Sequence, residues 1–182
     1  MAEIVCSRGE VVLIDDEDYP VISRHSWAIT YSEGNASSHK RSYALTTLNT
    51  YEGAKKTVMM HNLIMGFGKQ IDHVNGNTFD NRKCNLRRAT HQENGWNKGK
   101  PKGGRFGKPA SQYKGVSRCI SRDGTVYWRV IIKLTAKGVV PAKFVRLGPF
   151  NSEIAAARAY NEEIVKHRGE FAWVNPISTQ LA

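Results

Sequence analysis

The sequence lacks several features that would place it in other protein classes. No window approaches eighteen consecutive apolar residues, so no membrane span is expected. The first residues lack the basic and long apolar regions of a secretory signal. The three cysteines, Cys6, Cys84 and Cys119, are too few and too far apart for a disulfide framework or a four-cysteine zinc site. These absences predict a cytoplasmic protein without zinc.

Positive charge is abundant and unevenly distributed. The net charge of the 182 residues is +11, from 27 Lys and Arg against 16 Asp and Glu. Residues 98–146 hold thirteen of these cations but only one of the acids, Asp123. A solvated basic surface kept for solubility is the alternative, but solubility does not require such segregation. We therefore expect a polyanionic partner, since each neutralised phosphate releases condensed counterions.

The composition of residues 98–112 predicts a linker. Four glycines, two prolines and five cations in fifteen residues cannot form a core helix or a central strand. We expect its cations, among them Lys102 and Lys108, to lie along a phosphate backbone. The linker divides the chain into a first domain, residues 1–97, and a second, residues 113–176, followed by a short tail, residues 177–182.

The first domain holds a strand, loop, strand and helix pattern at about residues 69–97. Residues 69–73 read as a strand, Asn75-Gly76 is a turn signal, and residues 86–89 are a second strand. Thr90-x-x-Glu93 is a capping box, which predicts a helix beginning at His91. Other expected elements are strands at residues 11–14, 42–45 and 57–60, and a turn or short helix leading to a strand within residues 21–29.

This pattern suits metal-assisted hydrolysis of a phosphodiester. Asp72 and the amide oxygen of Asn94 are oxygen donors of the kind that Mg²⁺ accepts. His73 titrates near neutrality and suits a general base. An asparagine could orient its second ring nitrogen. The alternative is a polar turn and capped helix with no activity.

At Asp72-His73, Asn85 and Asn94 the sequence resembles the HNH nucleases, whose ββα-metal motif has this order and spacing. The resemblance implies that Asp72 and Asn94 bind the metal, that His73 is the general base and that Asn85 orients His73. The spacings from His73 to Asn85 and from Asp72 to Asn94 are similar to those in phage and intron-encoded HNH homing endonucleases. Residues 60–66 resemble a further segment of these nucleases. A supporting role is assigned to His61, with a packed structural histidine as the alternative. Supporting roles are also assigned to His91 and Asn97, as substitute ligands, since Asn94 and Asn97 are expected to share a helix face.

The second domain is expected to be three strands followed by a helix. The strands are predicted at residues 113–116, 127–133 and 143–150. A helix is predicted from Glu153 to about Lys166, because Asn151-Ser152 can cap it and Gly169 can stop it. One face of the middle strand can pack on this helix, while the other meets phosphates and bases.

This order of residues resembles the Apetala-2-type DNA-binding domain, which inserts a three-stranded sheet into the major groove. The resemblance rests on residues 113–116, Leu147-Gly148-x-Phe150, residues 155–161 and Phe171-Ala172-x-x-Asn175. It implies a set of DNA-facing cations: Lys114, Arg118, Arg129, Lys133 and Arg146.

The sequence thus predicts an α+β protein, in which an HNH ββα-metal core is joined by a basic linker to a three-stranded antiparallel sheet with one helix. The expected activity is that of a homing-type DNA endonuclease using Mg²⁺, with Mn²⁺ able to substitute. We expect it to act as a monomer on double-stranded DNA, in a bacterial or phage-infected cell, with no small-molecule cofactor. The alternatives are a DNA-binding regulator with an inactive nuclease core and an RNA-binding protein.

Overall fold

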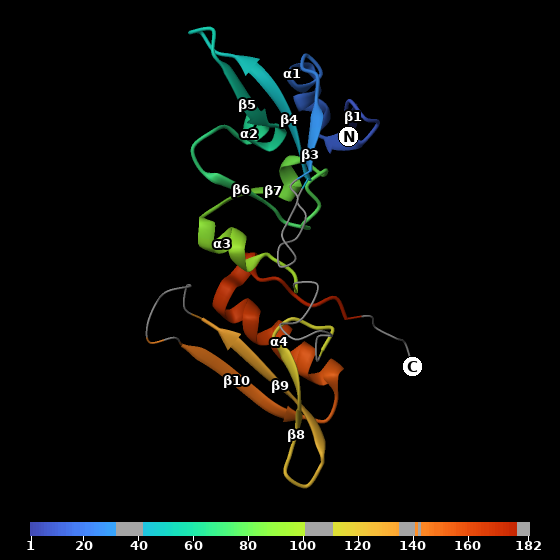
Figure 1. Ribbon diagram of the computed structural model, residues 1–182, viewed down its shortest axis with the longest axis vertical. Coiled ribbons are helices and arrows are strands. Elements are labelled where there is room, and N and C mark those ends of the chain that lie inside the picture. Colours follow the sequence, from blue (N-terminus) through green and yellow to red (C-terminus); the bar gives the residue numbers. More distant parts are fainter. Residues whose placement is uncertain (32–41, 101–110, 135–140, 142, 178–182) are drawn as a thin grey trace. The chain divides into compact units, whose positions relative to one another are not determined.

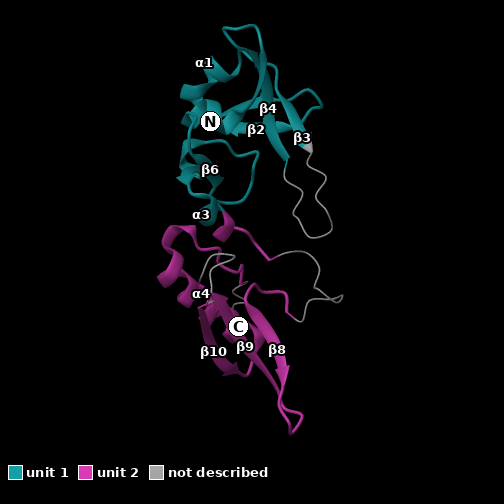
Figure 2. Cartoon of the chain, turned by 60° about the vertical axis from the view of Figure 1, so that its left-hand side comes forward, with its two compact units in different colours: residues 1–94 teal, residues 95–182 magenta. Residues whose placement is uncertain are grey.

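The computed structural model describes residues 1–31, 42–100, 111–134, 141 and 143–177 (Figure 1). The chain divides into two compact units, residues 1–94 and 95–182 (Figure 2). Each unit has its own hydrophobic core, and every sheet is antiparallel. No helix in the described ranges is long and apolar enough to cross a bilayer. The structure is therefore α+β, as the sequence predicts.

The first unit begins with two small sheets and two short helices. In chain order these elements are β1 (Ala2–Val5), β2 (Val11–Ile14), α1 (Tyr19–Ile22), β3 (Ala28–Tyr31), β4 (Ser42–Asn49), β5 (Lys55–Met59) and α2 (Met60–Met65). β1 pairs with β2, and the other strands form a sheet in the order β3-β4-β5. Its core contains Val12, Ile14 and Met60, each with no exposed surface, and Trp27, whose indole N–H donates to the carbonyl of Ile22 at 2.8 Å.

The strand, loop, strand and helix predicted for the nuclease motif are present. They are β6 (Gln70–His73), β7 (Leu86–Ala89) and α3 (His91–Trp96). The capping box forms as expected: the Thr90 N–H donates to Glu93 Oε2 at 2.7 Å, and the Glu93 N–H donates to Thr90 Oγ1 at 3.2 Å. These two bonds satisfy amides that the first turn of α3 leaves without helical partners.

The second unit is a three-stranded sheet packed on one long helix. Its elements are β8 (Val116–Ile120), β9 (Val126–Lys133), β10 (Phe144–Phe150) and α4 (Glu153–Arg168), and the strand order is β10-β9-β8. Alternate residues of β9, Val130 and Ile132, are buried against α4, which contributes Ala156, Tyr160 and Ile164 to the same core. The predicted sheet with one helix is therefore confirmed.

The first strand of this sheet begins later than expected. Residues 113–116 were predicted to be that strand, but β8 begins at Val116. Gly115 has a φ of +77°, and a Cβ at this position would lie 2.3 Å from the Tyr160 ring. The backbone must therefore turn and approach the helix closely before the strand can start.

The ends of the predicted linker are fixed to the second unit. The Lys100 ammonium donates to the carbonyls of Ser111 and Tyr113, the latter at 3.1 Å, and Gly99 packs against the Trp173 ring. Residues 98–100 and 111–112 thus have defined contacts within the second unit. The middle of that segment, including Lys102 and Lys108, lies outside the described residues.

Candidate active site

Asp72 and His73 end strand β6 and are both 5% exposed. Neighbouring residues of a strand point to opposite faces. The Asp72 side chain accordingly meets β7, while the His73 ring meets rings from β4 and α2. The two groups therefore have separate surroundings.

The His73 ring packs against two other rings. His61, in α2, lies edge-on with its ring centroid 5.3 Å away, and the centroid of Tyr43, in β4, lies at 6.1 Å. Burial lowers the pKa of His61 from 6.5 to about 4, with a smaller contribution from the charge of His73. His61 is therefore uncharged near neutral pH.

The side chain beside a ring nitrogen of His73 is Asn81. The distance from His73 Nε2 to Asn81 Oδ1 is 3.4 Å, and Asn81 itself is 1% exposed. Asn85, expected in this role, has other partners: its Oδ1 accepts from the Asn75 N–H at 2.9 Å, and its Nδ2 donates to the Asp80 carbonyl at 2.8 Å. In the contacts described here, Asn85 organises the loop and Asn81 approaches the histidine.

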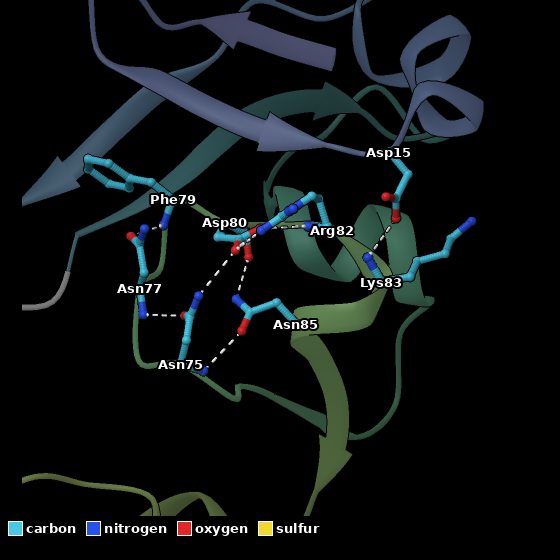
Figure 3. Close-up of polar contacts among 8 residues, drawn as sticks. All are labelled: Asp15, Asn75, Asn77, Phe79, Asp80, Arg82, Lys83 and Asn85. Carbon is cyan, nitrogen blue, oxygen red and sulfur yellow. Dashed lines mark hydrogen bonds and ion pairs between the residues drawn. The ribbon is translucent and has the colours of Figure 1, made fainter. Parts of the chain in front are cut away.

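A polar network shapes the loop between β6 and β7 (Figure 3). Both Asp80 oxygens accept from the Arg82 guanidinium at 2.7 Å, and one also accepts from Asn75 Nδ2 at 3.1 Å. These hydrogen bonds hold the pKa of Asp80 below its usual range. The loop is also tied to β2, because the Asn81 N–H donates to the Leu13 carbonyl at 2.8 Å. This hydrogen bond fixes the backbone of Asn81, whose side chain approaches His73.

Asp72 is paired with Arg87. The two residues are register partners on β6 and β7, and the Arg87 Nε and Nη2 groups donate to Asp72 Oδ2 at 3.0 and 2.7 Å. Their side chains are 6% and 11% exposed. The proposed metal ligand thus carries a buried arginine as its partner.

Asn94 lies in α3 and lines an open pocket of about 460 Å³. Tyr43 and His61, the rings that contact His73, line the same pocket, as do Asn62 and Lys69. The structure thereby brings the expected ligand Asn94 into one pocket with the rings that surround the expected base.

Asp72 and Asn94 carry the kinds of donor atom that a hard divalent cation accepts. Carboxylate and amide oxygens, supplied by Asp72 and Asn94, are the ligands that Mg²⁺ takes, together with water and phosphate. Within the described ranges, no group of three or more His, Cys, Asp or Glu side chains is arranged to hold a metal ion.

The two remaining supporting residues lie elsewhere. The His91 Nδ1 is 3.2 Å from Gln70 Nε2, and His91 lines a different pocket, with Arg88 and Glu93. Asn97 was expected to share a helix face with Asn94, but α3 ends at Trp96 and Asn97 lies in the following turn.

Three of the predicted DNA-facing cations share one face of the second unit. Arg129, Lys133 and Arg146 are exposed on the side of the sheet that faces away from the buried residues of β9. The Arg146 guanidinium also lies over the Phe144 ring, 5.2 Å from its centroid. We call the face formed by these three cations the basic sheet face.

Arg118 and Lys114 are not part of the basic sheet face. Arg118 pairs in register with Trp128, which packs on the core, so it projects to the side of the helix. The Lys114 ammonium donates to the carbonyls of Trp96, at 3.1 Å, and Lys98. Burial, with a smaller contribution from Arg168, lowers the pKa of Lys114 to about 8. Lys114 therefore holds a backbone segment of its own unit.

Three residues of the site were not predicted from the sequence: Tyr43, Asn81 and Arg87. Asn81 stands within the motif Asp80-Asn81-Arg82, whose order alone does not tell which asparagine reaches the histidine. Arg87 could have been found, because a hairpin that pairs residue 73 with residue 86 also pairs 72 with 87. Tyr43 is distant in the sequence and carries no such signal.

One comparison with known proteins gives a match. Residues 67–96 match the family model described as HNH endonuclease, and these residues contain β6, β7 and α3. No curated protein and no solved structure matches the chain. Members of the HNH family are nucleases that generally use a divalent metal. The chain therefore carries an HNH endonuclease domain at residues 67–96, which is consistent with a phosphodiester hydrolase, and the family implies nucleic acid as the substrate.

Proposed function

We propose that this protein is a metal-dependent endonuclease that hydrolyses a phosphodiester of double-stranded DNA, with His73 as the general base and one divalent cation. The observation that carries the proposal is the HNH match over a hairpin and helix that hold Asp72, His73 and Asn94. The pocket lined by Asn94 and His61 supports it, because a nucleotide bound there lies next to the rings around His73.

In this mechanism Asn81 sets the tautomer of His73. Asn81 Oδ1 can only accept a hydrogen bond, so His73 Nε2 carries the proton and the lone pair lies on Nδ1. In this tautomer His73 acts as the general base toward the attacking water. Asn85 contributes by holding the loop that positions Asn81.

Neutral His61 favours this proton transfer. His73 becomes a cation when it takes the proton, and a charged neighbour 5.3 Å away would oppose that step. Because the pKa of His61 is about 4, its ring adds no like charge at neutral pH. Its polarisable edge can still pack against the His73 ring.

Asp72 and Asn94 would hold the cation, for which we propose Mg²⁺, with Mn²⁺ able to replace it. When bound, the cation acts as a Lewis acid on the scissile phosphate and stabilises charge on the leaving oxygen. The ligand residues fix its place relative to His73, which acts on the water.

For the second unit we propose an Apetala-2-type reader of DNA. A β-ribbon fits the major groove, and the basic sheet face offers three cations to phosphates or base edges. We propose the domain division given by the sequence, residues 1–97 and 113–176, with Lys102 and Lys108 as further phosphate contacts. The biological role proposed is that of a homing endonuclease acting as a monomer in the bacterial cytoplasm.

The test is cleavage of a random-sequence DNA library, with and without Mg²⁺, by the wild type and by His73→Ala. We expect cleavage to fall by several orders of magnitude in the variant, because water loses its base, while DNA affinity changes little. His25→Ala is a matched control, since His25 packs on Trp27 in the first unit and has no role in the mechanism.

Cleavage by His73→Ala at the wild-type rate would refute the assignment of the base. Full activity in excess chelator would refute the role of the metal. Specific DNA binding by the wild type without cleavage in any divalent cation would favour the alternative, a DNA-binding regulator. Cleavage of RNA but not DNA would change the substrate class.

A further inference from the structure

Asp72, the carboxylate proposed to bind metal, is in an ion pair with Arg87. Two guanidinium nitrogens donate to one oxygen of Asp72, Oδ2, and both side chains are nearly buried. The backbone enforces the contact, since Asp72 and Arg87 are register partners across the hairpin. Asp72 is thus neutralised by a cation that belongs to the protein itself.

A divalent cation and a guanidinium on one buried carboxylate repel each other. Opposite charges stabilise a buried group, and an additional like charge at a few ångströms is costly where water is scarce. Binding of the cation to Asp72 must then weaken the contact with Arg87. The displaced guanidinium would need a new anion, because an unpaired buried charge is strongly unfavourable.

We propose that Arg87 is a metal-gated phosphate ligand: it occupies Asp72 in the metal-free protein and passes to the phosphate of the nucleic acid when the divalent cation binds. A phosphate is the anion that fits, since the planar guanidinium binds phosphate oxygens through two parallel hydrogen bonds. The proposal rests on the proposed function, which supplies both the cation and the phosphate. It gives Arg87 two opposite effects, against metal binding and in favour of cleavage.

The opposite effects of Arg87 on metal binding and on cleavage can be tested separately. Mn²⁺ is titrated calorimetrically into the intact protein without nucleic acid, for the wild type, Arg87→Gln, Arg87→Lys and Arg88→Gln. We expect Arg87→Gln to bind Mn²⁺ about tenfold more tightly, because its competitor on Asp72 is gone, and Arg87→Lys to lie between it and the wild type. At saturating Mn²⁺, cleavage by Arg87→Gln should fall about a hundredfold.

Arg88→Gln is the matched control. It removes the same charge one position along β7, where the guanidinium donates to the Met65 carbonyl instead of Asp72. Its affinity for Mn²⁺ should stay at the wild-type value. Arg87→Lys keeps a cation next to Asp72. If Arg87→Gln does not fold, the same measurements can be made on Arg87→Lys.

Equal or weaker Mn²⁺ binding by Arg87→Gln, or by Arg87→Lys where only that variant folds, would overturn the competition. Wild-type cleavage at saturating Mn²⁺ in the same variant would overturn the transfer to phosphate. A separate titration of Asp72→Asn distinguishes these results from failure of the proposed function. If Mn²⁺ binds the wild type and Asp72→Asn equally, the metal site itself is wrong and the proposal on Arg87 fails with it.

Discussion

At the scale of single residues, the alternation of strand β6 separates two chemical tasks. Asp72 and His73 are consecutive, yet one side chain meets a guanidinium and the other meets two aromatic rings and an amide. A metal ligand and a general base must not neutralise each other, and opposite faces of a strand keep them apart. This separation is compatible with the two roles proposed for Asp72 and His73.

Substitution of the proposed ligands should show which one carries the charge. We expect Asp72→Ala to reduce Mg²⁺-dependent cleavage more than Asn94→Ala. Only the Asp72 substitution removes a negatively charged ligand of the cation. Asn94→Asp should keep part of the activity, since an oxygen ligand remains. Cleavage rates across a Mg²⁺ titration provide the measurement. Equal loss in all three variants, with unchanged dependence on Mg²⁺, would contradict this assignment.

The depressed pKa of His61 predicts a dependence of stability on pH. The folded protein holds this pKa at about 4, whereas the unfolded chain has the ordinary value of 6.5, so the unfolded state binds more protons between these values. The free energy of unfolding should therefore fall as the pH drops below 6.5, with the loss complete near pH 4. His73, the neighbouring charge, strengthens the trend because it repels a protonated His61.

Urea unfolding of the wild type and His61→Gln between pH 7 and pH 4 measures this effect. From the two pKa values, the wild type should lose as much as about 3 kcal/mol relative to the variant over this range. His25→Gln is the comparison for a histidine in the same unit. A difference between the wild type and His61→Gln that does not change with pH would show that His61 is not buried as a neutral ring.

At the scale of elements, α3 is too short to be stable alone. It has six residues, and isolated helices of this length do not persist in water. Its first turn depends on the reciprocal bonds between Thr90 and Glu93, and Asn94 follows directly. The position of the proposed ligand Asn94 therefore depends on the hydrogen bonds of this cap.

Removal of the cap should lower both stability and activity. We expect Thr90→Ala to reduce the free energy of unfolding by about 1 kcal/mol, a usual cost for a lost N-cap. Mg²⁺-dependent cleavage should fall as well, because Asn94 loses its fixed position. Ser152→Ala is the control, since Ser152 caps α4 in the second unit by accepting from the Ala155 N–H at 3.1 Å.

The Thr90 variant can be separated from its control by two readouts. Both variants should show a similar loss in urea unfolding, but only Thr90→Ala should weaken calorimetric Mn²⁺ binding. If both variants retain Mn²⁺ affinity, the cap does not position Asn94, and its role is limited to stability.

At the scale of the whole molecule, the HNH motif and the basic sheet face belong to different units. The HNH match falls almost entirely within residues 1–94, whereas the basic sheet face belongs to residues 95–182. Each unit also has its own core, so neither depends on the other for its hydrophobic packing. Affinity for nucleic acid and hydrolysis are therefore expected to respond to different substitutions.

A salt titration of DNA binding tests this division. The triple variant of the full chain in which Arg129, Lys133 and Arg146 become Gln should lower the slope of log affinity against log salt by about 2.7, at about 0.9 for each lost phosphate contact. Arg158→Gln and Lys166→Gln, exposed on α4, should change it little. An unchanged slope in the triple variant would show that the basic sheet face does not contact phosphate.

The elements that depend on signals within a few residues, such as helix caps, could be predicted from the sequence. The bounds of β7 agree with the strand predicted at residues 86–89, the start of α3 follows from a capping box, and α4 follows from its Ser152 cap and the Gly169 stop. These signals act over a few residues, so a linear reading can recover them. The pairing of Asp72 with His73 as a nuclease motif is likewise a local pattern, and the family match at residues 67–96 agrees with it.

The contacts between side chains that are distant in the sequence depend on the tertiary fold. Two asparagines were available to approach His73, and the ties of the loop to β2 put Asn81 there, while Asn85 bonds to the loop backbone. Lys114 was expected on the DNA-facing side, but the close approach of Gly115 to Tyr160 turns the chain before the strand begins. Partner choice among polar side chains depends on packing and burial over the whole unit, because each buried donor and acceptor must find a partner. Composition and spacing do not contain that information.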